Sequence, residues 1–257
     1  MRPLIGTSFK MNLTSSEAAG YFDALRPMVA FMTSCELFVL PPFTSMWVAR
    51  ERLRGSNVSW GAQDVHAEDA GAHTGDISAL MLADLGCMFV EVGHSERRRD
   101  YGETDEIVAL KVHQILLHQM TPIMLVGEPT QGRPEAALGY VLGQVQAGMK
   151  LVPHRDHNRV VIAYEPVWAI GVDSAPADPS HIGTVHRGLR DLLRSAAGGG
   201  VGSRVIYGGS IDPLTAGPIL AQDGVDGLFV GRAALDPSHF AAIAGKAQER
   251  VSGLTKP

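Results

Sequence analysis

Residues 160–171 read VVIAYEPVWAIG and decide how the chain is expected to fold. The unbroken apolar run that leads to Glu165 is typical of a parallel strand buried on both faces. Pro166 then holds the preceding residue in an extended conformation. Seven other short apolar runs also stop at Gly, Pro or a polar residue: Leu4–Lys10, Leu37–Pro41, Val58–Asp64, Met88–Gly93, Pro122–Gly127, Arg204–Gly209 and Gly227–Gly231.

Longer stretches with helical spacing separate these runs: Ser15–Phe31, Thr104–Gln119, Pro134–Lys150, Asp178–Ser195 and Pro237–Val251. Several open with residues that favour a helix start, such as Ser15-Ser16-Glu17 and Asp178-Pro179. Eight β-then-α units in 257 residues predict an α/β protein, a single-domain (β/α)8 TIM barrel over residues 1–257. A doubly wound open sheet is the competing architecture.

Composition excludes several other classes of protein. The chain has 22 Lys and Arg against 27 Asp and Glu, a net charge of −5, which argues against binding to nucleic acid or to an anionic membrane surface. No apolar run approaches the roughly 18 residues of a membrane span, and the first residues do not resemble a secretory signal. Cys35 and Cys87 form neither a disulfide framework nor a metal motif. We expect a soluble, cytoplasmic protein.

In a barrel of this kind the chemistry belongs at the carboxyl ends of the strands. Lys10 follows the first apolar run, His94 the fourth and Glu165 the sixth. A strand-end Glu or a loop His, taken alone, is more often a surface or packing residue. Their convergence on one rim, together with two glycine-containing turns, predicts an active site.

Each of these groups has a chemistry that suits it. Glu165, at the end of an apolar strand, is expected to lose hydration and to act as a general base, and Val167–Gly171 has the composition of a lid that excludes water. His94 precedes what reads as a helix start. Because a helix N-terminus lowers the pKa of an imidazole, its neutral ring is expected to donate a hydrogen bond to a developing oxyanion.

Lys10 is a fixed cation with Glu96 as a candidate partner. It is suited to holding a phosphate, stabilising an enediolate or forming a Schiff base. The turns Gly208-Gly209-Ser210 and Gly231-Arg232 follow the seventh and eighth runs, where barrels often bind phosphate through backbone N–H groups. Ala196–Gly202 (AAGGGVG) lacks the Gly-Lys-Ser/Thr of a phosphate loop and is interpreted as a connection.

Taken together, the motifs resemble the triosephosphate isomerase family. They are, in chain order, SFKMN at 8–12, GHSERR at 93–98, GETD at 102–105, AYEPVWAIG at 163–171 and YGGS at 207–210. The resemblance continues to GRAAL at 231–235 and so covers essentially the whole chain.

The resemblance implies a cofactor-free isomerase that moves a carbonyl along a small phosphorylated ketose through a cis-enediolate. By this resemblance Glu165 would shuttle the proton, His94 would be the electrophile and Lys10 would supply electrostatic stabilisation, the arrangement known for the family. Ser95 and Glu96 would support them. The backbone N–H groups that would hold the phosphate are those of Gly171, Ser210, Gly231 and Arg232. No metal is expected, and the neighbouring His154 and His157 are assigned none.

A homodimer is also implied by the resemblance. His73–Ser78 (HTGDIS) matches a family loop whose Thr, here Thr74, reaches the active site of the partner subunit, with Asp76 where Glu is usual. No nucleic-acid or membrane partner is expected.

Ser8 is the most informative departure from the family pattern, which has Asn there. A shorter side chain removes a contact and opens space beside the reacting carbons, enough for one additional hydroxymethyl group. The TSFKMN opening and PPFT at 41–44 resemble the tetrulose-phosphate isomerase branch of tetritol catabolism. The predicted reaction converts L-erythrulose 1-phosphate to D-erythrulose 4-phosphate. The alternative is interconversion of dihydroxyacetone phosphate and glyceraldehyde 3-phosphate.

The lid and the last strand depart as well. Residues 171–176 read GVDSAP, where Pro176 has no N–H to donate and Asp173 adds negative charge, so low activity on triose phosphates is expected. Arg232 replaces a Gly and is expected to contact the additional hydroxyl or the phosphate, or to point to solvent. A Schiff-base aldolase using Lys10 and a non-catalytic sugar-phosphate sensor are the alternatives from other classes.

Overall fold

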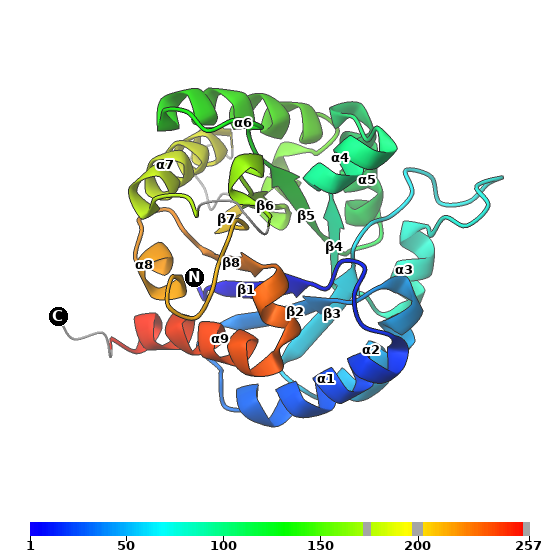
Figure 1. The fold of residues 1–257 in the computed structure, drawn as a ribbon. Coiled ribbons are helices and arrows are strands. Elements are labelled where there is room, and N and C mark those ends of the chain that lie inside the picture. Colours follow the sequence, from blue (N-terminus) through cyan, green and yellow to red (C-terminus); the bar gives the residue numbers. More distant parts are fainter. Residues whose placement is uncertain (172–175, 197–202, 254–257) are drawn as a thin grey trace.

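Eight parallel strands close into one barrel in the computed structural model, which describes residues 1–171, 176–196 and 203–253 (Figure 1). Each strand pairs with the next along the chain, and β8 pairs with β1, so the open-sheet alternative is wrong. The strands are β1 (Leu4–Ser8), β2 (Glu36–Leu40), β3 (Val58–Ala62), β4 (Phe89–Val92), β5 (Thr121–Val126), β6 (Val161–Tyr164), β7 (Arg204–Tyr207) and β8 (Gly227–Val230).

The predicted runs all contain a strand, and each strand ends one or two residues before the predicted end. The one or two predicted residues that follow each strand belong to the rim of the barrel, where the chain leaves the sheet. Residues 197–202 of the glycine-rich connection lie outside the described part of the chain, as do residues 172–175.

Helices surround the barrel (Figure 1). The five predicted helices are present within two residues of their expected ends, together with shorter helices that the sequence analysis did not delimit. They are α1 (Ser15–Val29), α2 (Met46–Leu53), α3 (Ala79–Leu85), α4 (Ser95–Tyr101), α5 (Asp105–Leu117), α6 (Pro134–Gly148), α7 (Pro179–Ala196), α8 (Ala216–Leu220) and α9 (Pro237–Ser252), with 3-10 turns η1 (Phe43–Ser45), η2 (His154–Arg159), η3 (Val167–Ala169) and η4 (Arg232–Leu235).

The N-cap of the first helix lies one residue before the predicted helix start at Ser15. Thr14 is the N-cap of α1: its side chain accepts a hydrogen bond from the Glu17 N–H, and the Glu17 side chain accepts one from the Thr14 N–H. This reciprocal capping box satisfies two backbone donors, which is why the helix starts there and not after Ser15.

The core has two layers because successive strand residues point to opposite faces. A large cluster fills the space between strands and helices, and a smaller one fills the inside of the barrel. Phe38 is central to the inner cluster: its ring stacks on Phe89, with centroids 4.7 Å apart, and on Phe229 at 5.7 Å. Gly6 leaves room for that ring, since a Cβ there would lie 1.9 Å from it.

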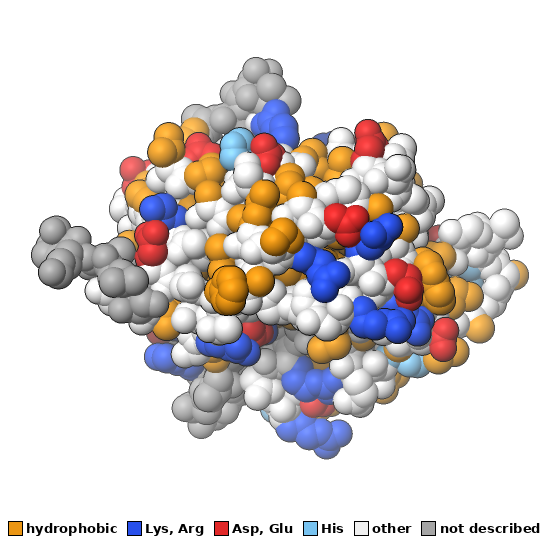
Figure 2. All heavy atoms as spheres, turned by 90° about the horizontal axis from the view of Figure 1, so that it is seen from below, with side chains coloured by type: hydrophobic (Ala, Val, Ile, Leu, Met, Phe, Trp, Pro, Cys, Tyr) orange, Lys and Arg blue, Asp and Glu red, His pale blue; other side chains and the backbone are white. Residues whose placement is uncertain are grey.

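Charges of both signs share the surface seen in Figure 2, where Lys and Arg side chains lie among Asp and Glu. In the parts of the chain that the structure describes, no helix is long and apolar enough to cross a membrane.

The inner cluster gives a direct test of what holds the barrel together. Phe38→Ala removes a fully buried ring and leaves a cavity, and is expected to lower the free energy of unfolding by about 3–5 kcal/mol in urea titrations. Phe31→Ala is the matched control, because that ring is 88% exposed and its loss is expected to change little. Equal effects of the two changes would contradict the assignment of the inner core.

Candidate active site

A cleft of about 660 Å³ opens at the carboxyl ends of the strands. Most of the residues predicted for the active site line it, and they come from the ends of four different strands, the segments that follow them, and the first turn of α4. They are Ser8, Lys10, Glu96, Glu165, Gly171, Ser210, Gly231 and Arg232. His94 is 4% exposed and contacts Glu165. The predicted convergence on one rim is therefore present in the structure.

Lys10 is held in an unusual backbone conformation. Its φ is 51°, in the left-handed region that non-glycine residues rarely occupy. The Gln63 amide donates to the Lys10 carbonyl at 3.1 Å and to the Leu40 carbonyl at 3.0 Å, and so ties this turn to the neighbouring strand. Strain maintained by surrounding contacts is typical of functional positions. Gln63 was not assigned this role from the sequence.

The Lys10 amine lies against carboxylates. Nζ is 2.8 Å from Glu96 Oε1, as predicted. Burial lowers the pKa of Lys10, but Glu165 and Glu96 outweigh burial and raise it above its ordinary value. The amine therefore stays charged and provides a fixed cation at the rim.

His94 is the N-cap of α4, and its ring orientation is fixed from that side. Its Nδ1 accepts the backbone N–H of Glu96 at 3.0 Å. Nε2 faces the cleft side and lies 3.1 Å from Glu165 Oε2. A neutral ring with its proton on Nε2 satisfies both contacts, because an Nδ1 that accepts a hydrogen bond carries no proton.

The charge state of His94 differs from the sequence-based expectation. Burial lowers the pKa of His94, but the facing carboxylates of Glu165 and Glu91 raise it to about 9. The predicted helix N-terminus is present and favours the neutral ring, yet the nearby negative charges outweigh it. A charged Glu165 therefore favours the protonated imidazolium, and a neutral Glu165 favours the neutral imidazole.

Glu165 is buried and rigidly placed. It is 7% exposed, and its backbone N–H donates to the Val126 carbonyl at 2.8 Å. Gly127 allows this close approach, since a Cβ there would lie 1.9 Å from the Glu165 carbonyl oxygen. Apart from its 3.1 Å contact with His94 Nε2, Oε2 has no hydrogen-bond partner among the described residues. The carboxylate is thus free to accept a proton from a molecule in the cleft.

The segment after Glu165 is anchored to a carboxylate that sequence reasoning missed. Glu128 accepts hydrogen bonds from Trp168 Nε1 at 2.6 Å and from the Tyr164 hydroxyl at 3.0 Å. It lies at the end of β5, beside the segment expected to form a lid. Val172–Ala175 of that segment, including Asp173, lie outside the described residues; Pro176 is described and exposed.

The glycine turns follow β7 and β8, the strands that precede β1 around the closed barrel, and line the same cleft as Lys10. Ser210 and Gly231 belong to these turns, and Arg232 bridges them to the start of the predicted lid, where its guanidinium donates to the Gly171 carbonyl at 3.1 Å. None of the roles offered for Arg232 from the sequence included this contact.

Three predicted residues do not line the cleft: His94, which contacts Glu165 at its edge, Ser95 and Thr74. Ser95, the first residue of α4, borders a small cavity of about 20 Å³ that Glu165 also lines. Thr74 is exposed on the loop between β3 and α3, which projects away from the barrel (Figure 1).

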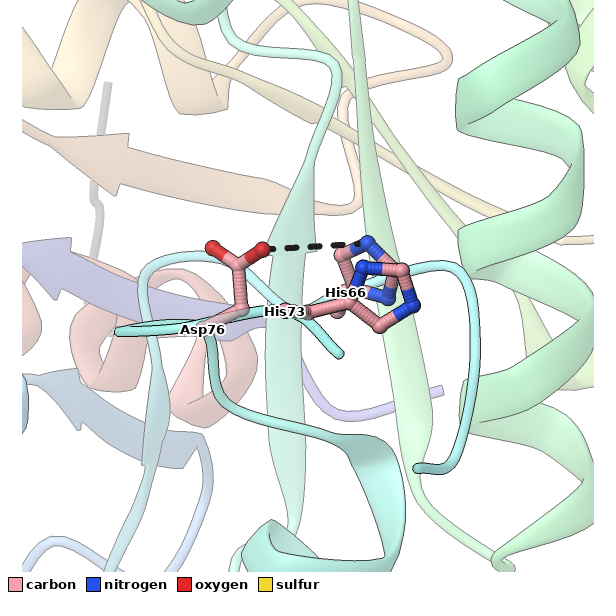
Figure 3. Close-up of side chains that lie close together, drawn as sticks. All are labelled: His66, His73 and Asp76. Carbon is pink, nitrogen blue, oxygen red and sulfur yellow. Dashed lines mark ion pairs between the residues drawn. The ribbon is translucent and has the colours of Figure 1, made fainter. Parts of the chain in front are cut away.

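That same loop contains a cluster of potential metal ligands. His66, His73 and Asp76 have ligand atoms within 4.8 Å of one another (Figure 3). The two imidazole rings have centroids 4.0 Å apart and planes tilted by 32°, His66 Nδ1 accepts the Glu68 N–H, and His66 Nε2 lies 3.7 Å from Asp76. Both ring nitrogens of His66 therefore have partners within the loop, and these contacts account for the cluster.

The fold and the site define an enzyme with a general base, an imidazole and a fixed cation on one barrel rim. A family model described as triosephosphate isomerase matches residues 3–247. The triosephosphate isomerase of Aquifex aeolicus is 40% identical over 245 residues, which are 95% of this chain and 98% of that protein. The L-erythrulose-1-phosphate isomerase of Rhizobium etli is 42% identical over 233 residues, 90% of this chain and 86% of that protein.

A solved structure agrees with these sequence matches. The triosephosphate isomerase from Bartonella henselae has a TM-score of 0.85 and 32% identity, and the match covers 96% of this chain and 99% of that one. The chain belongs to the triosephosphate isomerase family. It is a sugar-phosphate isomerase, and the family acts on small phosphorylated substrates.

The dependence of His94 on its neighbour is measurable. Glu165→Gln removes the carboxylate that does most to raise the pKa of His94, so that pKa is expected to fall from about 9 towards or below its ordinary value of about 6.5. Ring ¹⁵N chemical shifts across a pH titration report both the pKa and the tautomer. A pKa that stays near 9 would mean that another group sets the charge of the imidazole.

Proposed function

We propose that this enzyme isomerises L-erythrulose 1-phosphate to D-erythrulose 4-phosphate in tetritol catabolism, with triosephosphate isomerisation as the alternative. The observation that carries the proposal is Ser8, whose short side chain lines the cleft at the end of β1 beside Lys10 and Glu165. The tetrulose differs from the triose by a hydroxymethyl group on the reacting carbon, and a short residue leaves space for that group. The similarity to the Rhizobium etli protein supports the same substrate.

The reaction needs one base for the carbon-bound proton. Glu165 takes the proton from C3 of the substrate, which gives a cis-enediolate over C2 and C3. The same carboxyl returns the proton to C2, the hydroxyl proton of O3 passes to O2 by way of His94 Nε2, and the carbonyl has then moved to C3. Because the proton and the electron pair stay within the substrate, the reaction balances without an oxidant, a reductant or any other cofactor.

His94 and Lys10 stabilise the enediolate. When Glu165 takes the substrate proton it loses its charge, and with it the main influence that raises the pKa of His94. Burial and the Glu96 N–H then favour the neutral imidazole, which donates from Nε2 to the enediolate oxygens. Lys10, held by Glu96, adds a positive charge to the same region.

The phosphate would bind opposite these groups. The backbone N–H groups of Gly171, Ser210, Gly231 and Arg232 are the proposed donors, because these residues border one side of the cleft. By holding the Gly171 carbonyl, the Arg232 guanidinium keeps the start of the lid near this position. A charged phosphate ester does not cross a bilayer unaided, which fits the cytoplasmic location expected from the sequence.

The substrate proposal is tested by measuring kcat/KM for L-erythrulose 1-phosphate and dihydroxyacetone phosphate on the same preparation. We expect a preference for the tetrulose of about 100-fold or more, because a pocket shaped for the additional group is left partly empty by the triose. Ser8→Asn should fill that space and reverse the preference. A wild-type enzyme that prefers the triose would contradict the proposal and leave the alternative.

A homodimer is the second part of the proposal. The loop that carries Thr74 projects from the same side of the barrel as α2, α3 and α4 (Figure 1). Large hydrophobic side chains are exposed on these helices and on the rim: Met11, Trp47, Leu80, Met81 and Tyr101. Exposed apolar groups gathered around a projecting loop support a protein–protein interface there. In the family arrangement Thr74 would enter the active site of the partner near Lys10.

Thr74→Arg tests the dimer. The larger, charged side chain is expected to prevent the loop from entering the partner, so the protein should elute as a monomer in size-exclusion chromatography with light scattering and lose about 10-fold or more in kcat/KM. Thr33→Arg is the control, because Thr33 is also exposed but lies at the start of β2, at the opposite end of the barrel. A fully active, dimeric Thr74→Arg protein would argue against this role of the loop.

A further inference from the structure

The side chain of Arg232 joins two of the segments proposed to hold the phosphate. Arg232 is the first residue of η4, directly after the turn that ends β8, and it lines the cleft. Its guanidinium Nη2 donates to the Gly171 carbonyl at 3.1 Å. The contact brings a positive charge next to Gly171, whose backbone N–H is one of the proposed phosphate donors.

The other charges of the cleft do not match a phosphate. Besides histidine, the charged residues that line it are Lys10, Arg232, Glu96, Glu165 and Asp212. Lys10 Nζ lies 2.8 Å from Glu96 Oε1, so its charge is already compensated by a carboxylate. A phosphate ester has a charge of about −1.5 to −2 at neutral pH. Such an anion enters a cleft with three carboxylates more favourably when a further cation faces it.

Arg232 is available for this purpose. Its side chain makes no ion pair with the residues that the structure describes, and the Gly171 contact is its only hydrogen bond among them. Asp212 does not compete for it, because Oδ1 of Asp212 accepts the backbone N–H groups of Leu214 and Thr215, each at 2.8 Å. A guanidinium has five N–H donors in a planar fork, and most of those of Arg232 therefore remain for a molecule in the cleft.

We propose that the Arg232 guanidinium is a ligand of the substrate phosphate, which it binds with the donors that the Gly171 contact leaves open. The inference rests on the phosphate site of the proposed function but not on the number of carbons in the ketose. A guanidinium fits two phosphate oxygens with parallel N–H···O bonds. It also supplies a full positive charge, whereas backbone N–H groups supply partial charges.

A role limited to holding Gly171 explains less. One hydrogen bond to a carbonyl needs a single N–H donor, which a shorter amide side chain also provides. Ordering a long, exposed side chain costs conformational entropy that one exposed hydrogen bond offsets poorly. Charge-assisted bonds to a phosphate would add the missing stabilisation when the substrate is bound, and the Gly171 contact would keep the guanidinium in place beforehand.

The test combines calorimetric titration with inorganic phosphate and steady-state kinetics on L-erythrulose 1-phosphate and dihydroxyacetone phosphate. Arg232→Gln keeps an amide donor but removes the charge. It is expected to weaken phosphate binding and raise KM for both ketoses by about 10-fold or more, the loss of hydrogen bonds to a charged group, with little change in kcat. Arg232→Lys keeps the charge without the fork and should lie between Arg232→Gln and wild type.

Arg26→Gln is the matched control. Arg26 is exposed in the last turn of α1, at the opposite end of the barrel, and its loss changes the net charge by the same amount. Phosphate affinity and KM should stay unchanged in this variant, whereas a general effect of net charge would alter both variants alike. Added salt should weaken substrate binding less in Arg232→Gln than in wild type, because one charge fewer contributes. Urea titrations check that each variant is folded.

The outcomes separate this inference from the substrate proposal. Both ketoses carry a phosphate, so a wild-type preference for the triose would overturn the tetrulose function and leave the role of Arg232 intact. Unchanged phosphate affinity and KM in Arg232→Gln would overturn the role of Arg232, whichever ketose is preferred. A lower kcat with unchanged phosphate affinity would overturn it too, because Arg232 would then act only by holding Gly171.

Discussion

Pairing of β8 with β1 is the contact on which the site depends. Leu4 lies opposite Gly227 in the register, and a Cβ at Gly227 would come within 1.9 Å of the Leu4 carbonyl oxygen. The absence of a side chain lets the last strand approach the first and close the barrel. Closure places Lys10, from the first strand, within electrostatic reach of Glu165, from the sixth. An open sheet has no equivalent way to bring such distant strand ends together.

Closure also concentrates charge at the rim. Glu91, Glu96 and Glu165 lie around two basic groups, Lys10 and His94. The carboxylates raise the pKa of both bases, so each proton that enters or leaves one group changes the others. Movement of a single proton to Glu165 therefore changes the state of His94 without any movement of the backbone. The chemistry depends on this coupling as much as on any individual residue.

The sequence predicted most of the positions in this site but fewer of the contacts. The apolar runs give the order of the strands along the chain, so local pattern favoured a barrel over an open sheet and placed Lys10, His94 and Glu165 at strand ends. The net charge of His94 could not be predicted in this way, because it depends on carboxylates brought close by the fold. Gln63 and Glu128 were missed for the same reason: a polar residue at a strand end does not reveal which donor or acceptor it will meet.

Glu91 shows how charge and stability compete within such a site. Its pKa of about 7 lies above the roughly 4.3 of an unfolded glutamate, so its contribution to stability is complete below about pH 4.3 and is lost as the pH rises to 7. At neutral pH and above, the charged carboxyl costs about 3 kcal/mol, an order-of-magnitude figure. The aromatic layer of Phe38, Phe89 and Phe229 packs on the same inner face of the barrel and contributes apolar burial that offsets part of this cost. The cost is incurred 4.0 Å from His94, whose pKa Glu91 helps to raise, and an apolar residue there would make a more stable barrel.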